Sequence, residues 1–287
     1  MPAFTASDGT VLTYHLVGEG EPLLCIPGGP MRASAYLGDL GGLSKQRRLV
    51  LLDLRGTGGS GLPDTLATYR CDRQVDDIEE LREHLGLERV DVLAHSAGGD
   101  LALLHAARHP HRVRSLSLIT SRARALGIDF TEEHRREAAL LRAAEPWFAS
   151  AQEAWEAVWA GSATDADWDA ISPFFYGRWD AAAQTHAASE AAQSNAEAAE
   201  AYAASGAFDP AAARAVMASL DARVLVLAGA LDSGPLPRVA AAVAELFPRA
   251  ELAVQPDAGH YPWLDDPLRF RDTVGGFLAQ QEPGRPA

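Results

Sequence analysis

The stretch VDVLAHSAGGDLALLHAARHP, residues 90–110, contains the change of pattern that decides the fold. A β-prone apolar run over 90–94 ends at HSAGG, and a helical pattern over about 98–109 follows at once. Ser96 therefore lies on a sharp turn between a strand and a helix. The surrounding residues match the G-x-S-x-G nucleophile pattern except that Ala94 replaces the first Gly. The alternative is an ordinary loop serine that caps a helix.

Strand and helix patterns alternate on both sides of this turn. Asp8-Gly9 separates two β-prone runs and predicts a hairpin. The further strand candidates are EPLLCI (21–26), RRLVLLDL (47–54), VRSLSLITS (113–121), RVLVLAG (223–229) and 252–255. Because helical patterns separate most of them, we expect an α/β fold whose mostly parallel, eight-stranded sheet is flanked by helices. Ligands of such a sheet bind at the carboxyl ends of its strands.

Residues 122–220 interrupt this alternation with an Ala-rich segment that has almost no strand-like run. We expect a helical domain here, inserted into a core domain made of residues 1–121 and 221–287. Within it, AASEAAQSNAEAAEAYAASGAFDP (187–210) has a strongly helix-forming composition and predicts a long helix that ends near Gly206. The final residues, 282–287, have the composition of a frayed tail.

Composition and charge exclude several classes of function. The chain has 287 residues, of which 47% are hydrophobic and 22% charged, and its formal net charge is −14. This acidic balance argues against nucleic acid or an anionic membrane as a partner. The N-terminus has no signal-peptide pattern and no apolar run is long enough to span a membrane, so we expect a cytoplasmic monomer or homodimer.

The cysteines and histidines do not predict a metal site. Cys25 and Cys71 are far apart in the sequence and are expected to be free thiols. His105, His109 and His111 have no accompanying carboxylate motif, and we interpret them as surface histidines at a helix end. We expect no metal and no organic cofactor.

Three residues have the chemistry and chain order of a catalytic triad. A serine hydroxyl needs a base in contact with it, a group that orients the base, and donors for the oxyanion. Asp232 comes a few residues after one late strand, and His260 follows the last strand candidate. Asp257, Asp265 and Asp266 are rival acids, but they are too close in sequence to His260 to occupy a separate strand end. The order Ser96, Asp232, His260 predicts nucleophile, orienting acid and base.

An oxyanion hole needs two backbone N–H groups. One would come from Ala97, directly after the serine, and the other from the loop PGGP (27–30) after the third strand. Gly29 is the preferred donor and Gly28 the second choice, because Pro30 has no N–H to donate.

Together these segments resemble a known family. PGGP (27–30), LDLRGTGGSG (52–61), AHSAGG (94–99), LAGALDSGP (227–235) and AGHYPWLDDP (258–267) resemble α/β-hydrolases of the proline iminopeptidase type. The resemblance covers about 4–121 and 221–280. It implies the α/β-hydrolase fold, a helical cap, a Ser96–His260–Asp232 triad and oxyanion donors at Gly29 and Ala97. Pro27 stands where the family loop usually begins with His.

The predicted activity is that of a serine hydrolase that cleaves an ester, amide or thioester bond of a small molecule through an acyl-enzyme. A proline iminopeptidase acting on short peptides, and a lyase or cyclase on the same fold, remain alternatives. Peptidases of this type present cap carboxylates to the substrate's amino group; Glu190, Glu197 and Glu200 are candidates, although a solvated helix face explains them as well. The candidate substrate contacts are Gly28, His95, Trp147, Phe175, Tyr176, Trp179 and Glu197.

Overall fold

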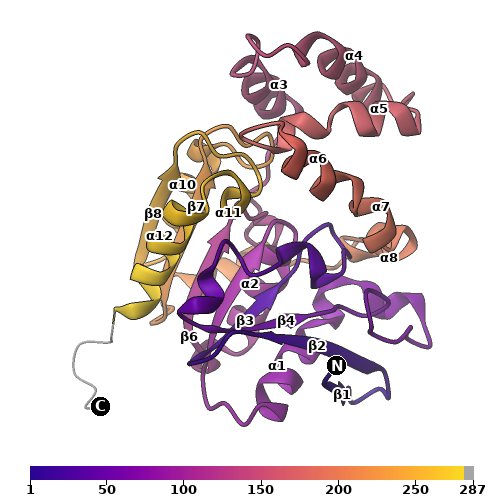
Figure 1. Cartoon of the computed structure of the whole chain (residues 1–287). Coiled ribbons are helices and arrows are strands. Elements are labelled where there is room, and N and C mark those ends of the chain that lie inside the picture. The colour runs from indigo at the N-terminus through magenta and orange to yellow at the C-terminus, as the bar shows by residue number, and fades with distance from the viewer. Residues whose placement is uncertain (281–287) are drawn as a thin grey trace.

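The computed structural model describes residues 1–280. It contains an eight-stranded sheet in the order β1-β2-β4-β3-β5-β6-β7-β8 (Figure 1). The strands are β1 (Ala3–Thr5), β2 (Val11–Val17), β3 (Pro22–Ile26), β4 (Arg48–Leu52), β5 (Val90–His95), β6 (Val113–Ile119), β7 (Arg223–Gly229) and β8 (Ala250–Gln255). The β1–β2 and β2–β4 pairs are antiparallel and the others are parallel, as expected.

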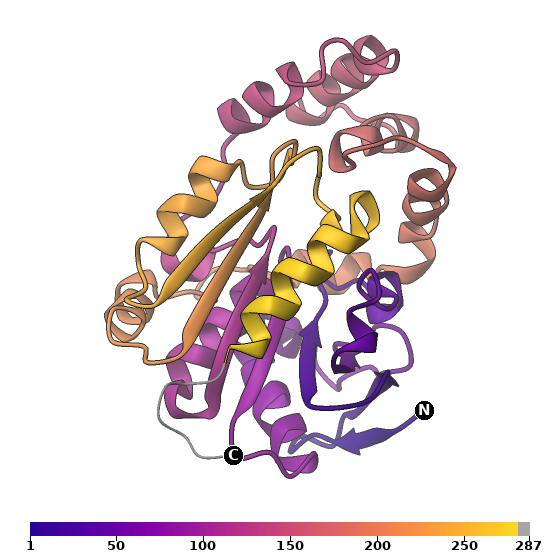
Figure 2. The same ribbon diagram turned by 60° about the vertical axis from the view of Figure 1, so that its left-hand side comes forward.

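Helices cover both faces of the sheet (Figure 2). The helices outside the 122–220 segment are α1 (Val75–His84), α2 (Gly98–Arg108), α10 (Pro237–Ala244), α11 (Pro262–Asp265) and α12 (Pro267–Ala279). Successive strand residues point to opposite faces, so Leu24 belongs to one hydrophobic cluster with residues of α1 and α2. Its neighbour Leu23 belongs to a second cluster with residues of α12. The helices α1 and α2 therefore cover one face of the sheet and α12 covers the other.

The segment between β6 and β7 is helical. Its helices are α3 (Glu132–Leu140), α4 (Phe148–Trp159), α5 (Asp165–Ala170), α6 (Ala181–Ala188), α7 (Glu190–Gln193), α8 (Ala196–Tyr202) and α9 (Pro210–Met217). Figure 1 shows α3, α4 and α5 beyond one end of the sheet and α6 to α8 leading back toward it. The segment has a hydrophobic cluster of its own around Trp155. In contrast, Tyr202 of α8 and Met217 of α9 belong to the large cluster of the sheet.

The prediction of one long helix ending near Gly206 was wrong. The helix-forming stretch is divided into α6, α7 and α8, and Ser194 between the last two has an extended backbone, with φ −103° and ψ 142°. Ser194 forms an isolated β-bridge with Arg32, and Asn195 donates its backbone N–H to the Met31 carbonyl at 3.0 Å. The Asn195 side chain then caps α8. Hydrogen bonds to the 31–33 backbone therefore replace the helical hydrogen bonds that composition alone favours.

Two smaller expectations have different outcomes. Cys25 and Cys71 are buried free thiols, as expected. The prediction that His105 lies on the surface was wrong. It is fully buried, and its Nε2 lies 3.2 Å from a Glu79 carboxylate oxygen. The expected frayed tail, 282–287, lies outside the described residues.

Candidate active site

Ser96 occupies the turn between β5 and α2 in a conformation that L-residues rarely adopt. Its φ is +52°, in the left-handed region. Two glycines make this turn possible. A Cβ on Gly28 would lie 2.7 Å from the Ser96 Cβ, and one on Gly98 would lie 2.5 Å from the Pro27 carbonyl oxygen. Strained backbone of this kind is concentrated at functional sites, and the N-terminus of α2 favours negative charge nearby.

His260 is hydrogen-bonded to Asp232 at the ends of the last two strands. The His260 Nδ1 lies 3.1 and 3.0 Å from the two Asp232 carboxylate oxygens. Asp232 is fully buried and also accepts the Gly234 N–H at 2.6 Å. Because a carboxylate only accepts, this contact places a proton on Nδ1 and leaves Nε2 as the basic nitrogen.

The rival acids have other partners. Asp265 accepts backbone N–H groups of Gly259 and Gly177, at 2.8 and 3.0 Å. Asp266 caps α12 by accepting the Arg269 N–H at 3.0 Å. Neither has a hydrogen bond to His260 within residues 1–280.

The end of β6 connects Ser96 to His260. Ser96 donates its backbone N–H to the Ile119 carbonyl at 3.1 Å. The next residue, Thr120, donates its hydroxyl to the His260 carbonyl at 2.9 Å. In the described part of the chain no hydrogen bond joins the two side chains directly, and such contacts often form only when substrate binds. Both side chains are nearly enclosed, with 8% of Ser96 and 7% of His260 exposed.

The two glycines of the loop after β3 differ in the use of their backbone N–H groups. The N–H of Gly28 is used, because it donates to the Tyr36 hydroxyl at 2.7 Å. The N–H groups of Gly29 and Ala97 have no acceptor among the described residues. Gly29 has a φ of +118°. Of the two loop glycines, only Gly29 therefore offers an unengaged donor.

His95 lies beneath the turn and is 1% exposed. Its Nε2 is 2.9 Å from the His260 carbonyl oxygen and its Nδ1 is 2.7 Å from the Tyr36 hydroxyl. A carbonyl accepts, so Nε2 carries the proton, and Tyr36 donates to Nδ1 while accepting from Gly28. Burial lowers the pKa of His95 well below its usual value. His95 is thus a neutral link in a hydrogen-bonded chain, and sequence reasoning missed Tyr36 because nothing in its own neighbourhood marks it.

The four candidate aromatic side chains of the 122–220 segment differ in whether they contact His260. Phe175 contacts it directly: the rings are 6.0 Å apart, and the Phe175 carbonyl accepts the His260 N–H at 2.7 Å. Tyr176 is buried, and its hydroxyl lies 2.8 Å from the His186 Nδ1. Trp179 packs against the Tyr176 ring at 5.4 Å. Trp147 packs against the cluster around Trp155, as Phe175 also does. Among these candidates only Phe175 is in contact with His260.

The candidate glutamates are not gathered at His260. Glu197 and Glu200 are exposed on α8 and have no hydrogen bond or ion pair within residues 1–280. Glu190 forms an ion pair with Arg32, at 3.1 Å. Arg32 is buried and also binds Gln193 at 2.9 Å, so this cation attaches α7 to the loop after β3.

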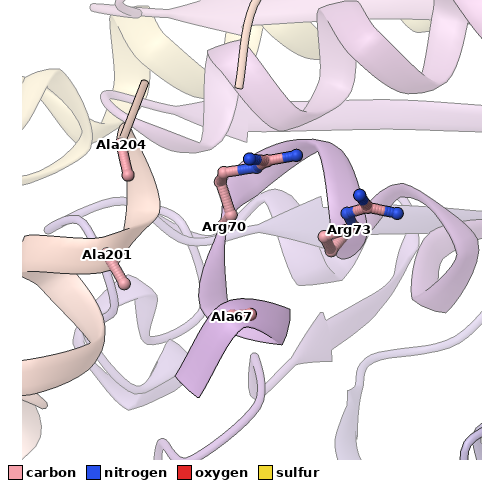
Figure 3. Close-up of a pocket in the computed structure, with 5 residues that line it drawn as sticks. All are labelled: Ala67, Arg70, Arg73, Ala201 and Ala204. Carbon is pink, nitrogen blue, oxygen red and sulfur yellow. The ribbon is translucent and has the colours of Figure 1, made fainter. Parts of the chain in front are cut away.

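A separate pocket lies between α8 and the 67–73 segment (Figure 3). It has a volume of about 250 Å3. Its lining residues, none of which is an expected site residue, are Ala67, Arg70, Arg73, Ala201 and Ala204. Asp72 binds the Arg70 guanidinium at 2.6 and 3.0 Å, so much of the positive charge there is already neutralised.

Metal-ligand clusters and membrane-spanning helices are both absent from residues 1–280. These residues contain no cluster of three or more His, Cys, Asp or Glu side chains arranged to hold a metal ion. None of their helices has the length and apolarity needed to cross a membrane.

The chain belongs to the α/β hydrolase fold family, whose model matches residues 21–267. This confirms the expected fold. A thermophilic esterase from Thermogutta terrifontis has a similar structure, with a TM-score of 0.70 and 23% identity over 96% of this chain and 97% of that one.

Relatives with similar sequences include proline iminopeptidases, the type that the sequence motifs resemble. A proline iminopeptidase from Lactobacillus acidophilus is 36% identical over 112 residues, or 37% of this chain and 38% of the relative. A cis-3-alkyl-4-alkyloxetan-2-one decarboxylase from Shewanella oneidensis is 29% identical over 122 residues, or 42% and 38%. The chain thus matches about two fifths of each relative's length.

Proposed function

We propose that this protein is a serine hydrolase that cleaves an ester, amide or thioester of a small molecule through an acyl-enzyme. The observation that carries the proposal is the buried Asp232–His260 hydrogen bond at the strand ends beside the left-handed turn at Ser96. Family membership supports it, since the matched relatives are named as enzymes of hydrolytic and related chemistry.

The reaction would proceed in two halves. His260 Nε2 takes the proton of the Ser96 hydroxyl as the oxygen attacks the substrate carbonyl, and Asp232 stabilises the resulting imidazolium. The N–H groups of Gly29 and Ala97 donate to the oxyanion, and His260 then returns the proton to the leaving group. Water, activated by His260, releases the acyl group from Ser96.

The 122–220 segment would act as the cap that encloses the acyl group. Support comes from Phe175, which contacts His260 from this segment, and from Arg32, which binds the segment to the oxyanion loop. We place Phe175 in the acyl pocket on this ground. Tyr176 and Trp179 would support its position.

A fluorophosphonate label tests the nucleophile. We expect one label per chain, located on Ser96 by peptide mass spectrometry and absent from Ser96→Ala. Substituting Asp232 by Asn lowers kcat by roughly 10³–10⁴-fold in a triad of this kind. Turnover that survives in Ser96→Ala would refute the acyl-enzyme and favour the lyase chemistry suggested by the decarboxylase relative.

Aminopeptidase activity is the second candidate, favoured by the named relatives. It requires a carboxylate that can bind the substrate's amino group. Glu190 is already paired with Arg32, and Glu197 is exposed without a described contact to the site. We therefore favour esterase activity, and comparing kcat/KM for a proline arylamide and for short acyl esters decides between them.

A further inference from the structure

Arg135 lies on the face of α3 that points toward the candidate active site. Residues three and four positions apart share a helix face. On the C-terminal side of Arg135 these residues are Ala138 and Ala139, and on its N-terminal side they are the exposed Thr131 and Glu132. Ala138 is buried against Leu236, in the loop that follows Asp232. Ala139 is buried in the cluster around Trp155. Arg135 therefore lies on the same face of α3 as the two alanines through which this helix packs against the rest of the protein.

Aromatic rings connect Arg135 to His260. The guanidinium carbon lies 4.7 Å from the Phe130 ring centroid and 5.7 Å from that of Trp155. Trp155 stacks on Phe175 with centroids 6.0 Å apart, and Phe175 meets the His260 ring at 6.0 Å. Arg135 is thus separated from the proposed catalytic base by two aromatic side chains.

The guanidinium of Arg135 has no acceptor. Its neighbours in the same segment are paired: Arg122 with Asp129 at 2.6 Å, and Arg136 with Glu132 at 2.7 Å. Within residues 1–280, Arg135 is half-buried and forms neither a hydrogen bond from its side chain nor an ion pair. None of its nitrogens is among the fully enclosed unpaired atoms, so its donors remain accessible.

The surroundings of Arg135 favour an anion. Burial and the charge of Arg122 lower the pKa of the guanidinium, while the charges of Asp129 and Asp232 act in the opposite direction. An arginine keeps its charge in proteins, so a partly desolvated one gains from an anionic partner. The nearby Trp155 indole N–H is also buried without an acceptor. Cation–π contacts attract the charge but satisfy none of its planar N–H donors.

We propose that Arg135 binds an anionic group, in particular a carboxylate, carried by the substrate at a distance from the bond that is cleaved. This inference rests on the proposed hydrolase function, because it assigns the substrate class of the same site. It predicts acidic acyl esters as preferred substrates. It also predicts a preference opposite to that of an aminopeptidase, which must bind a cationic amine.

The test compares substrates that differ only in charge. The 4-nitrophenyl monoesters of adipic and suberic acid are measured beside the same esters with the distal carboxylate methylated. We expect wild-type kcat/KM to be at least ~10-fold higher for the free acid at one of the two lengths, the size expected of a charge-assisted contact. In Arg135→Gln this ratio falls to about one, and Arg135→Lys retains part of it.

Arg136→Gln is the matched control, since it removes an adjacent arginine whose partners are the exposed Glu132 and Glu156. It should keep the wild-type ratio. Equal wild-type rates on acid and methyl ester, or an Arg135→Gln variant that keeps the ratio, would overturn the proposal.

A binding measurement separates this proposal from the hydrolase assignment. Thermal shift with adipate and with dimethyl adipate is measured in wild type and in Arg135→Gln. A shift caused by adipate alone, and absent from Arg135→Gln, supports the anion site even if no ester is cleaved and Ser96 is not labelled. No shift together with normal cleavage of neutral esters refutes the anion site and leaves the hydrolase intact.

Discussion

Removing the hydroxyl of Tyr36 should break the hydrogen-bonded chain beneath the active site. That hydroxyl accepts the Gly28 N–H at 2.7 Å and donates to the His95 Nδ1 at 2.7 Å. Tyr36 is 5% exposed and His95 1%. Tyr36→Phe leaves two buried polar groups without partners, and each costs about 1–3 kcal/mol. We therefore expect the free energy of unfolding to fall by roughly 2–6 kcal/mol.

The same substitution should affect catalysis, because His95 also donates to the His260 carbonyl at 2.9 Å. We expect kcat on a neutral ester to drop by about 10-fold or more, since small displacements of reacting groups reduce rates strongly. Urea unfolding followed by tryptophan fluorescence gives the stability, and steady-state kinetics gives kcat.

Tyr14→Phe is the matched control for Tyr36→Phe. Tyr14 is also 5% exposed and its hydroxyl also lies near a histidine, 3.2 Å from the His84 Nε2. Within residues 1–280, neither the Tyr14 hydroxyl nor the His84 ring is hydrogen-bonded to the loop after β3, so kcat should not change. If Tyr36→Phe lost no more stability than Tyr14→Phe and kept its kcat, the hydrogen-bonded chain would have no positioning role.

Three other predictions concern single positions. Gly28→Ala should lower kcat/KM by on the order of 100-fold, because the new Cβ would lie 2.7 Å from the Ser96 Cβ; unchanged kinetics would show that the loop can move away. Burial lowers the pKa of His186 to about 4, whereas the unfolded value is about 6.5. Stability should therefore fall by ~2 kcal/mol as pH drops from about 6.5 to about 4, after discounting for partial exposure, and an equally steep fall in His186→Gln would contradict this. Gly276→Ala, in an exposed helical position with no atom within 4 Å of the new Cβ, should raise the free energy of unfolding by about 0.5–1 kcal/mol in urea titrations.

The parts of the fold that sequence predicted are those determined by local pattern. Most parallel strands are short, largely apolar segments followed by Gly, Pro or a polar residue, and the order of such segments along the chain indicates the sheet. The prediction of Asp232 and His260 as site residues rests on the same kind of pattern, because the fold has these roles at particular strand ends. Their separation of 28 positions is bridged by the pairing of β7 with β8.

The parts that sequence did not predict depend on contacts between distant segments. The 181–202 region has a helix-forming composition throughout, yet the hydrogen bond from Asn195 to the Met31 carbonyl interrupts it. Arg135 is one of several arginines in the sequence, and only the packing of α3 distinguishes it from Arg136. Helix periodicity could have placed Arg135 on the face of Ala138, but it could not have shown that its guanidinium has no ion-pair partner within residues 1–280.

The imperfect match at Ala94 has a structural explanation. The two small positions of the nucleophile pattern are not equivalent in this chain. A Cβ at Gly98 would lie 2.5 Å from the Pro27 carbonyl oxygen, which is backbone and cannot easily move. The Ala94 side chain is instead fully buried within the large hydrophobic cluster of the sheet. The turn therefore requires glycine after Ser96 and accommodates one methyl group before it, so Ala94→Gly should remove a buried methyl without any gain for the turn.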